Sequence, residues 1–306
     1  MLGAEANPGL GSWSPDPALV IVIALAALYR LGDLRTSYGA RRAVTHRWRA
    51  ACFYAALVVF VLALDSPLDA YSERLFWVHM VQHGLLLTVV PPLIVLARPW
   101  TPLWRSLPLP TRRSLARAPA RSAAMRGVWA FGGWLGRPAP SFVLFSVVLL
   151  GWHVPALFDA TLRSLPLHAL EHLLFVFSAV LLFKQVIDSR PLRTHLGEVQ
   201  RVLYATGAML VTWVLAIALA IAPHPLYSSY AHEATRPGGI SAFTDQQIAA
   251  GIMWVPGSVT LMVVVFVYIH RWLAPSSDES AQRLAAATGT GPSRLAGNHF
   301  RGSARP

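Results

Sequence analysis

The sequence has 306 residues, of which 55% are hydrophobic and only 13% charged, and its formal net charge is +12. Soluble globular domains carry about 25% charged residues, so this composition excludes an ordinary soluble domain and indicates a membrane protein. The single cysteine, Cys52, excludes both a disulfide framework and a cysteine-based metal site.

Apolar segments follow one another along most of the chain, and they predict seven transmembrane helices. In chain order these lie near residues 17–30, 50–64, 76–97, 141–158, 168–187, 201–222 and 248–273. Several approach the roughly 20 residues that cross the hydrocarbon layer of a bilayer, and flanking aromatic residues extend the two shortest. Pro91–Pro92, Pro155 and Pro256 are expected to kink the third, fourth and seventh helices. The fold class that follows is an all-α, polytopic membrane helical bundle.

The distribution of basic residues orients this bundle. All but three of the 26 Lys and Arg residues fall in 30–49, 98–140, 184–201 and the stretch from Arg271 onward, so alternate loops are basic. By the positive-inside rule the N-terminus lies outside and the C-terminus is cytoplasmic. Anionic membrane lipid is a sufficient partner for this charge, and without an aromatic-interleaved basic motif no nucleic acid is expected.

Residues 1–274 are expected to form a single transmembrane bundle, and residues 275–306 a disordered cytoplasmic tail. Within the bundle the basic loop 98–140 is expected to be partly interfacial, because its segment GVWAFGGWLG is rich in aromatic residues. No cleavable signal peptide is expected, since the first seventeen residues have no positively charged region.

Two histidine pairs stand out at the starts of predicted helices. His79 and His83 lie in FWVHMVQHGLLL, and His168 and His172 lie in LHALEHLLFVF. A spacing of four residues places both imidazoles of a pair on one helix face, where they can share a ligand. Random placement of the eleven histidines would give about 0.4 such pairs. Because a polar group inside a membrane must find a partner, a shared metal ion is favoured over interfacial packing.

Other polar residues are expected near the outer surface as well. His153, in GWHVPALFDA, lies at a similar depth and is a further candidate ligand, although a single histidine at a helix end also suits an interfacial role. Carboxylates and amides beside a ligating imidazole can accept its second N–H, while a helix cap is the alternative role for an aspartate. Thioethers would favour cuprous ion, with core packing as the alternative. The candidate acceptors beside the imidazoles are Asp65, Glu171, Asp245 and Gln246, and the candidate thioether ligands are Met80 and Met253.

Several motifs occur together between about residues 65 and 270: SERLFWVHMVQHGLLLTVVPPLIVLARP, GWHVPALFDATL with LPLHALEHLLF, PLYSSYA, and TDQQIAAGIMWVPG. In these motifs the chain resembles the CtaG-like family of bacterial cytochrome c oxidase, or haem-copper oxidase, assembly factors. The motif positions carried onto this sequence are His79, His83, Pro91, Pro92, His153, His168, His172, Asp245, Gln246 and Trp254.

The resemblance implies a multi-pass protein of the bacterial plasma (inner) membrane that helps to form an active oxidase, with copper supply as its proposed role. It implies the oxidase catalytic subunit and a copper chaperone as partners, and an assembly role instead of catalysis. Imidazole suits copper, zinc and nickel, so the residues alone do not name the metal. Two alternatives therefore remain open: a zinc-dependent integral-membrane hydrolase and a bis-histidine haem protein.

Overall fold

The computed structural model describes residue 13 and residues 17–36, 40–189, 194–233 and 236–274. These residues form helices joined by short connections, and no β-strand occurs among them. The all-α fold class is therefore confirmed. The predicted tail, 275–306, lies outside the described residues.

Five helices are long and apolar enough to cross a membrane. They are residues Val44–Leu64 of α2 (Ala40–Leu64), the continuous stretch Phe76–Ala97, α11 (Leu165–Val186), α12 (Glu198–Ile221) and α14 (Ala242–Leu273). A sixth span is formed if α8 (Ala123–Leu135) and α9 (Pro138–Trp152), which meet at 81°, count as one broken helix. α1 (Pro17–Leu34) is not among them. The predicted number of seven spans is not confirmed.

Prolines account for most of the irregular helix geometry. Phe76–Ala97 consists of α4 (Phe76–Gly84), a π-helical turn at Leu85–Val89 and α5 (Val90–Ala97). The π turn ends two residues before Pro91–Pro92, which supply no N–H to a regular α-helix. The predicted helix 141–158 is in fact two helices, because α9 ends at Trp152 and α10 (Pro155–Leu162) begins at a proline. α14, in contrast, continues through Pro256.

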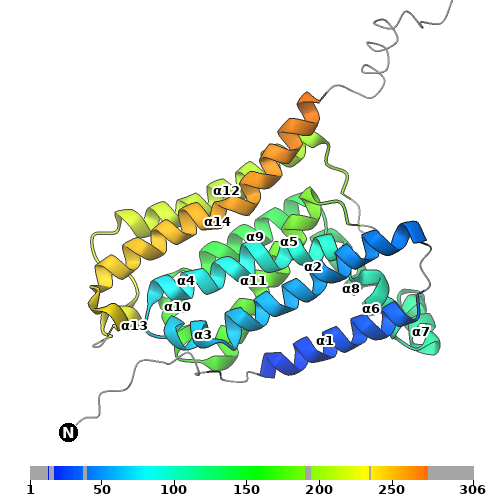
Figure 1. Cartoon of the computed structure of the whole chain (residues 1–306), viewed down its shortest axis with the longest axis horizontal. Helices are drawn as coiled ribbons and strands as arrows, with labels where there is room; N and C mark the ends of the chain where they lie inside the picture. Colours follow the sequence, from blue (N-terminus) through cyan, green and yellow to red (C-terminus); the bar gives the residue numbers. More distant parts are fainter. Residues whose placement is uncertain (1–12, 14–16, 37–39, 190–193, 234–235, 275–306) are drawn as a thin grey trace, which may run out of the picture.

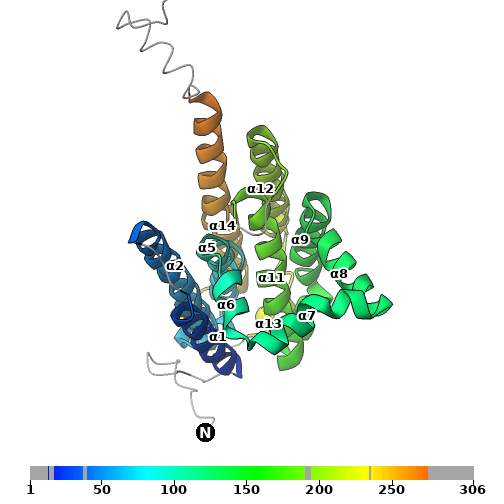
Figure 2. The ribbon, with the colours of Figure 1, turned by 90° about the vertical axis from the view of Figure 1, so that its right-hand side faces the viewer.

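The spans pack in layers (Figure 1). α12 and α14 lie side by side, α4 packs on α14, and α5 packs on both α2 and α11, while α9 packs on α11. α1 packs mainly on the short helix α6 (Trp100–Ser106) at one end of the bundle. The view in Figure 2 shows α7 (Leu109–Arg121) and α8 projecting beyond α9 and α11. The remaining short elements are α3 (Pro67–Ser72), α13 (Ser228–Ala231) and the 3₁₀ turn Pro237–Gly239.

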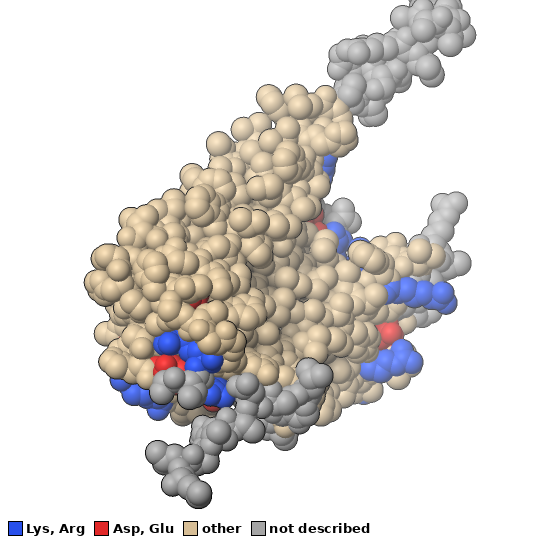
Figure 3. Space-filling view, turned by 60° about the vertical axis from the view of Figure 1, so that its left-hand side comes forward, with Lys and Arg blue, Asp and Glu red and all other residues tan. Residues whose placement is uncertain are grey.

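The outer surface of the bundle is apolar over a wide area. Figure 3 shows a broad surface without Lys or Arg, with charged side chains gathered toward its edges. Large apolar side chains are exposed on several helices, among them Val58, Val147, Leu173 and Val214. Such exposure on a soluble protein would mark an interaction site, and on membrane-spanning helices it is the surface that lipid covers.

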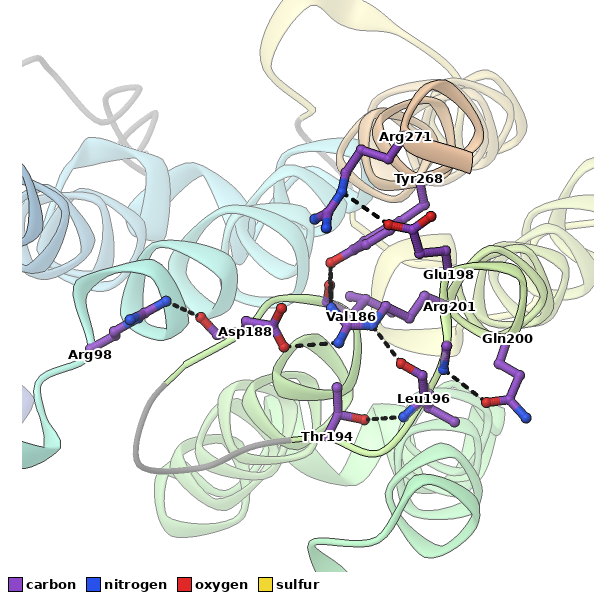
Figure 4. Close-up of polar contacts among 11 residues, drawn as sticks. Arg98, Val186, Asp188, Thr194, Leu196, Glu198, Gln200, Arg201, Tyr268 and Arg271 are labelled. Carbon is purple, nitrogen blue, oxygen red and sulfur yellow. Dashed lines mark hydrogen bonds and ion pairs between the residues drawn. The ribbon is translucent and has the colours of Figure 1, made fainter. Parts of the chain in front are cut away.

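A polar network closes one end of the bundle (Figure 4). Arg201, at the start of α12, is buried, and its guanidinium donates to an Asp188 carboxylate oxygen at 2.9 Å and to the Tyr268 hydroxyl at 2.6 Å. The Tyr268 hydroxyl in turn donates to the Val186 carbonyl. The hydrogen bond from Arg201 holds the pKa of Asp188 below its usual value. α11, α12 and α14 are thereby tied together at this end.

Candidate metal centre

The two predicted histidine pairs come together at the other end of the bundle. His79 and His83 from α4 meet His168, Glu171 and His172 from α11, and one ligand atom of each residue lies within 4.8 Å of those of the others. His79, His83 and Glu171 are fully buried, and His172 is 5% exposed. Below, these five residues are called the histidine cluster. Their convergence is a geometric finding, and metal binding by them stays a prediction.

Helix periodicity explains this convergence. Each pair is spaced by four residues, so its two imidazoles stack on one face of α4 or α11. α11 packs against the π turn and α5, which continue α4, and this packing brings the two faces together. The π turn begins directly after Gly84, one residue beyond His83, and π-helical turns frequently occur at functional sites.

The hydrogen bonds of Tyr230 identify the tautomer of His79. The Tyr230 hydroxyl donates its proton to the Ser72 carbonyl, which can only accept. The same hydroxyl lies 2.9 Å from His79 Nδ1, so Nδ1 carries a proton and donates it to the hydroxyl oxygen. His79 Nε2 is then a lone-pair nitrogen, which is the form that binds a metal ion.

The Nε2 atoms of His79 and His83 are 2.8 Å apart. Without a metal ion, His83 Nε2–H must donate to the lone pair of His79, which leaves His83 Nδ1 as an acceptor; this buried atom has no hydrogen-bond partner. With an ion present, both Nε2 lone pairs can point at it. Two nitrogens on a tetrahedral metal with bonds of about 2.0–2.1 Å are separated by about 3.3 Å, so only a small opening of this pair is required.

His153 stands beside the histidine cluster. Its Nδ1–H donates to the Leu149 carbonyl at 2.7 Å, so its Nε2 also carries a lone pair, and this buried atom has no hydrogen-bond partner. The His153 and His83 ring centroids are 5.6 Å apart. Nε2 of His172 is likewise buried without a partner. Buried polar atoms are rarely left unpaired, and a cation bound here would satisfy several at once.

Glu171 contributes the one carboxyl group of the cluster. Its nearest oxygen lies 3.7 Å from His83 Nε2, and both side chains are fully buried. A carboxylate can either join the imidazoles around a cation or accept an imidazole N–H. Four imidazoles and one carboxylate form a donor set that fits a copper or zinc ion.

Comparison with known proteins identifies the family of this chain. The family model described as "Cytochrome c oxidase caa3 assembly factor (Caa3_CtaG)" matches residues 27–274. The chain belongs to this family. Residues 27–274 include every member of the histidine cluster and also His153 and Tyr230.

Curated relatives of this CtaG-family chain come from mycobacteria. It is 26% identical over 251 residues to the uncharacterized proteins Mb0105 of Mycobacterium bovis and MT0111 of Mycobacterium tuberculosis, which covers 81% of this chain and 36% of each relative. It is 23% identical over 226 residues to the uncharacterized protein ML1998 of Mycobacterium leprae, covering 73% of this chain and 34% of that protein. The chain thus spans about a third of the length of these relatives. No solved structure matches it significantly.

Asp245 does not contact the cluster in this CtaG-family structure. It lies in the first turn of α14, and its two carboxylate oxygens accept the backbone N–H groups of Phe76 at 3.0 Å and Trp77 at 2.8 Å. It therefore caps the N-terminus of α4, a neighbouring helix, while Ser241 caps α14 itself. The capping role proposed as an alternative for Asp245 is what the structure shows, and it fixes the start of the helix that carries His79.

The other predicted residues have structural environments of their own. Gln246 accepts the Leu226 N–H at 2.8 Å and donates to the Leu219 carbonyl at 3.1 Å, so it ties the end of α12 to α14. Asp65 is buried at the end of α2 and is not part of the cluster. Met80 and Met253 belong to the main hydrophobic core, where their side chains pack among apolar residues. Trp254, a motif position, contacts Trp213 and is 43% exposed.

Two positioning residues were not identified from the sequence. Tyr230 orients His79, and Gln82 donates to the Ala63 carbonyl and to Asp69, both at 2.8 Å, which ties α4 to α2 and α3. Asp159, for which the sequence favours a helix-capping role, caps α13, the helix of Tyr230, by accepting from Ser228 and Ser229. Burial acts to raise the pKa of Asp159, but the hydrogen bonds from these serines outweigh it and hold the pKa below its usual value. The motif PLYSSYA was the one signal that could have identified Tyr230.

Replacement of Tyr230 by Phe is expected to weaken metal binding by about 10–100-fold, the usual cost of removing a residue that orients a ligating histidine. The substitution removes the hydroxyl that accepts the His79 Nδ1–H and donates to the Ser72 carbonyl. The measurement is a competition titration of the purified protein against a chelator of known affinity. Tyr227→Phe is the matched control, because the Tyr227 hydroxyl donates to the His153 backbone carbonyl instead of contacting an imidazole. Equal affinities of the two variants would contradict this role for Tyr230.

Proposed function

We propose that this protein assists the assembly of a haem-copper oxidase by binding copper on His79, His83, His168 and His172 and supplying it to the copper centre of the oxidase. The observation that carries the proposal is the convergence of these four imidazoles and Glu171, whose ligand atoms lie within 4.8 Å of one another and of which all but His168 are buried. The family to which the chain belongs supports an assembly role. The catalytic subunit of the oxidase is the proposed recipient, and a copper chaperone the proposed donor.

The donor set supports copper as the cargo. Copper has the highest affinity among the divalent first-row metals for a given site, and imidazole is a suitable ligand for it. The lone pairs assigned to His79 and His153, together with the unpaired nitrogen of His172, give a set of neutral nitrogen donors. Zinc shares this preference, so metal analysis must distinguish the two.

The geometry supports the two alternative functions less well. A haem held by two histidines needs its flat macrocycle between the imidazoles, and four imidazoles within 4.8 Å of one another leave no such layer. A zinc hydrolase needs an open coordination position and a cleft for water and substrate. The cavity that reaches His172 is lined by apolar side chains, and it suits a lipid-facing opening better than an aqueous cleft.

That cavity offers a path by which the metal can leave. It is a groove of about 680 Å³ between α1, α2, α5 and α11, and His172 is its only polar lining residue. We propose that the recipient approaches along this groove and takes the ion by ligand exchange. A buried site inside a membrane is reached in this way without passage of a charged ion through the hydrocarbon.

The proposed direction of transfer depends on membrane orientation. From the basic loops we propose seven spans, an external N-terminus, a cytoplasmic C-terminus and a location in the plasma membrane, with the histidine cluster near the outer surface. A reporter fused after residue 232 is then external and one fused after residue 275 cytoplasmic. The reverse result would contradict delivery from the outer side.

The test of the proposed function is the copper-to-haem ratio of oxidase purified from a strain that lacks this protein. We expect the oxidase polypeptide and haem to be present, with too little copper at the catalytic centre. Surplus copper in the medium should partly restore the ratio by mass action. A low ratio would favour copper supply over the two alternatives, because neither a hydrolase nor a haem protein gives a reason for copper to be lost. A normal ratio in the deletion strain would reject copper supply.

A further inference from the structure

A second cavity, of about 710 Å³, lies at the end of the bundle away from the histidine cluster. Its walls are α8, the start of α9, the last turn of α11 and residues 194 and 195. Lys184 and Gln185 line it from α11, twelve residues or more beyond His172, which corresponds to about 18 Å along the helix. The cavity is therefore separate from the proposed copper site.

The charged side chains that line this cavity are basic. Arg137 and Lys184 line it together with His195, and no Asp or Glu is among its lining residues. Lys184 is the only lysine in a sequence that otherwise uses arginine for its basic residues. Its ammonium group lies against Gly136, where an added Cβ would be only 2.6 Å from Nζ. Glycine at this position leaves the space that the ammonium group occupies.

Lys184 has no counter-charge within the described part of the chain. It makes neither an ion pair nor a hydrogen bond with the described residues, although its side chain is partly buried. A partly buried ammonium without a partner is costly, and an anion in the cavity would offset this cost. Basic pockets between transmembrane helices bind the phosphate groups of lipids for this reason.

The cavity is held in its shape by hydrogen bonds. Gln185 donates to the Gly136 carbonyl at 2.9 Å and to Ser141 Oγ at 3.2 Å, which fixes the junction of α8 and α9 on α11. On the other wall, Thr194 Oγ1 accepts the Leu196 N–H, and Arg201 donates to the Leu196 carbonyl at 3.0 Å (Figure 4). A preformed site loses little entropy when a ligand binds.

The surroundings favour a membrane lipid as the occupant. Val128 and Trp129 add apolar surface to the cavity, and α8 exposes Trp129, Phe131 and Trp134. Exposed tryptophans next to basic residues are typical of helices that lie in the headgroup region of a bilayer. We propose that this cavity binds the phosphate headgroup of an anionic phospholipid, with Lys184 and Arg137 as its cationic contacts and His195 as a further polar contact. This proposal is independent of the copper site.

The single lysine provides a direct test with the full-length protein in detergent. An amine-reactive reagent modifies Lys184, and peptide mass spectrometry separates this product from modification of the N-terminus. We expect phosphatidylglycerol in the micelles to slow the labelling of Lys184 by about tenfold when the lipid is present at about ten times its Kd. Phosphatidylcholine should give little protection, and native mass spectrometry should show phosphatidylglycerol retained by the protein.

Variants provide a second measurement. Lys184→Gln should lose retained phosphatidylglycerol, Lys184→Arg should keep it, and Arg113→Gln, which changes an exposed arginine on α7, is the matched control and should keep it. Protection by inorganic phosphate alone at a similar concentration would show a free-anion site and overturn the lipid assignment. Equal protection by phosphatidylcholine, or unprotected labelling in every lipid, would overturn the proposal. The labelling uses the unmodified protein, so the result does not depend on how the variants fold.

Discussion

Replacement of His79, His83, His168 or His172 by Ala, one at a time, is expected to abolish stoichiometric metal binding while the protein still inserts into the membrane. Each residue supplies one ligand atom to a group within 4.8 Å, so any single loss leaves an incomplete site. The affinity should fall by more than about 100-fold, because removal of a residue that merely orients a ligand already costs about 10–100-fold. The measurement is the metal content of each variant after size-exclusion chromatography.

Two histidines outside the cluster are the controls for these variants. His46 pairs with Asp33 at 2.6 Å, and His270 lies in the last turn of α14, so Ala at either position should leave the metal content unchanged. His153→Ala is expected to give an intermediate loss, because this imidazole stands beside the cluster instead of within it. If all four cluster variants kept the metal content of the wild type, the imidazoles would be packing residues and the shared site would be rejected.

Closure of the groove beside His172 is expected to separate metal binding from metal transfer. Ala169 lines the groove from α11 and is exposed, so Ala169→Trp should fill the groove without disturbing the buried cluster. A strain that makes this variant should yield oxidase with a copper-to-haem ratio as low as that of the deletion strain. The purified variant should still bind metal, because the imidazoles are unchanged.

Val147→Trp is the matched control for this closure. Val147 is 62% exposed on α9 and does not line the groove, so this variant should support a normal copper-to-haem ratio. A normal ratio with Ala169→Trp would show that copper leaves the cluster by another path. Loss of bound metal from Ala169→Trp would show that the substitution disturbs the metal site itself. The expected separation of metal binding from metal transfer at position 169 would then be contradicted.

Local patterns in the sequence predicted the helical fold and the position of each histidine pair on one helix face. A separation of four residues is fixed by the geometry of one helix, so His79 and His83 were expected to share a face before any tertiary structure was known. The predicted helix 141–158 was wrong at its C-terminal end, because Pro155 begins a new helix instead of kinking one.

Contacts between distant residues were beyond the reach of a single sequence. Asp245 caps α4 from 169 residues away, and Tyr230 orients His79 from 151 residues away. The local pattern at each residue fits several roles, and only the packing of α13 and α14 beside α4 selects one of them. The role of Arg201 was also beyond prediction. In the sequence it is one of many basic residues near the membrane surface, whereas in the structure it is buried and donates to Asp188 and Tyr268.

The most direct measurement of the central claim is X-ray absorption spectroscopy of the full-length protein purified from copper-supplemented cells, combined with its metal content. The proposed function predicts one copper ion per chain, with nitrogen scatterers and the multiple-scattering pattern of imidazole rings. Absence of retained copper would contradict the claim. A copper site dominated by sulfur scatterers would also contradict it, because the thioethers of Met80 and Met253 pack in the hydrophobic core and the cluster contains no sulfur.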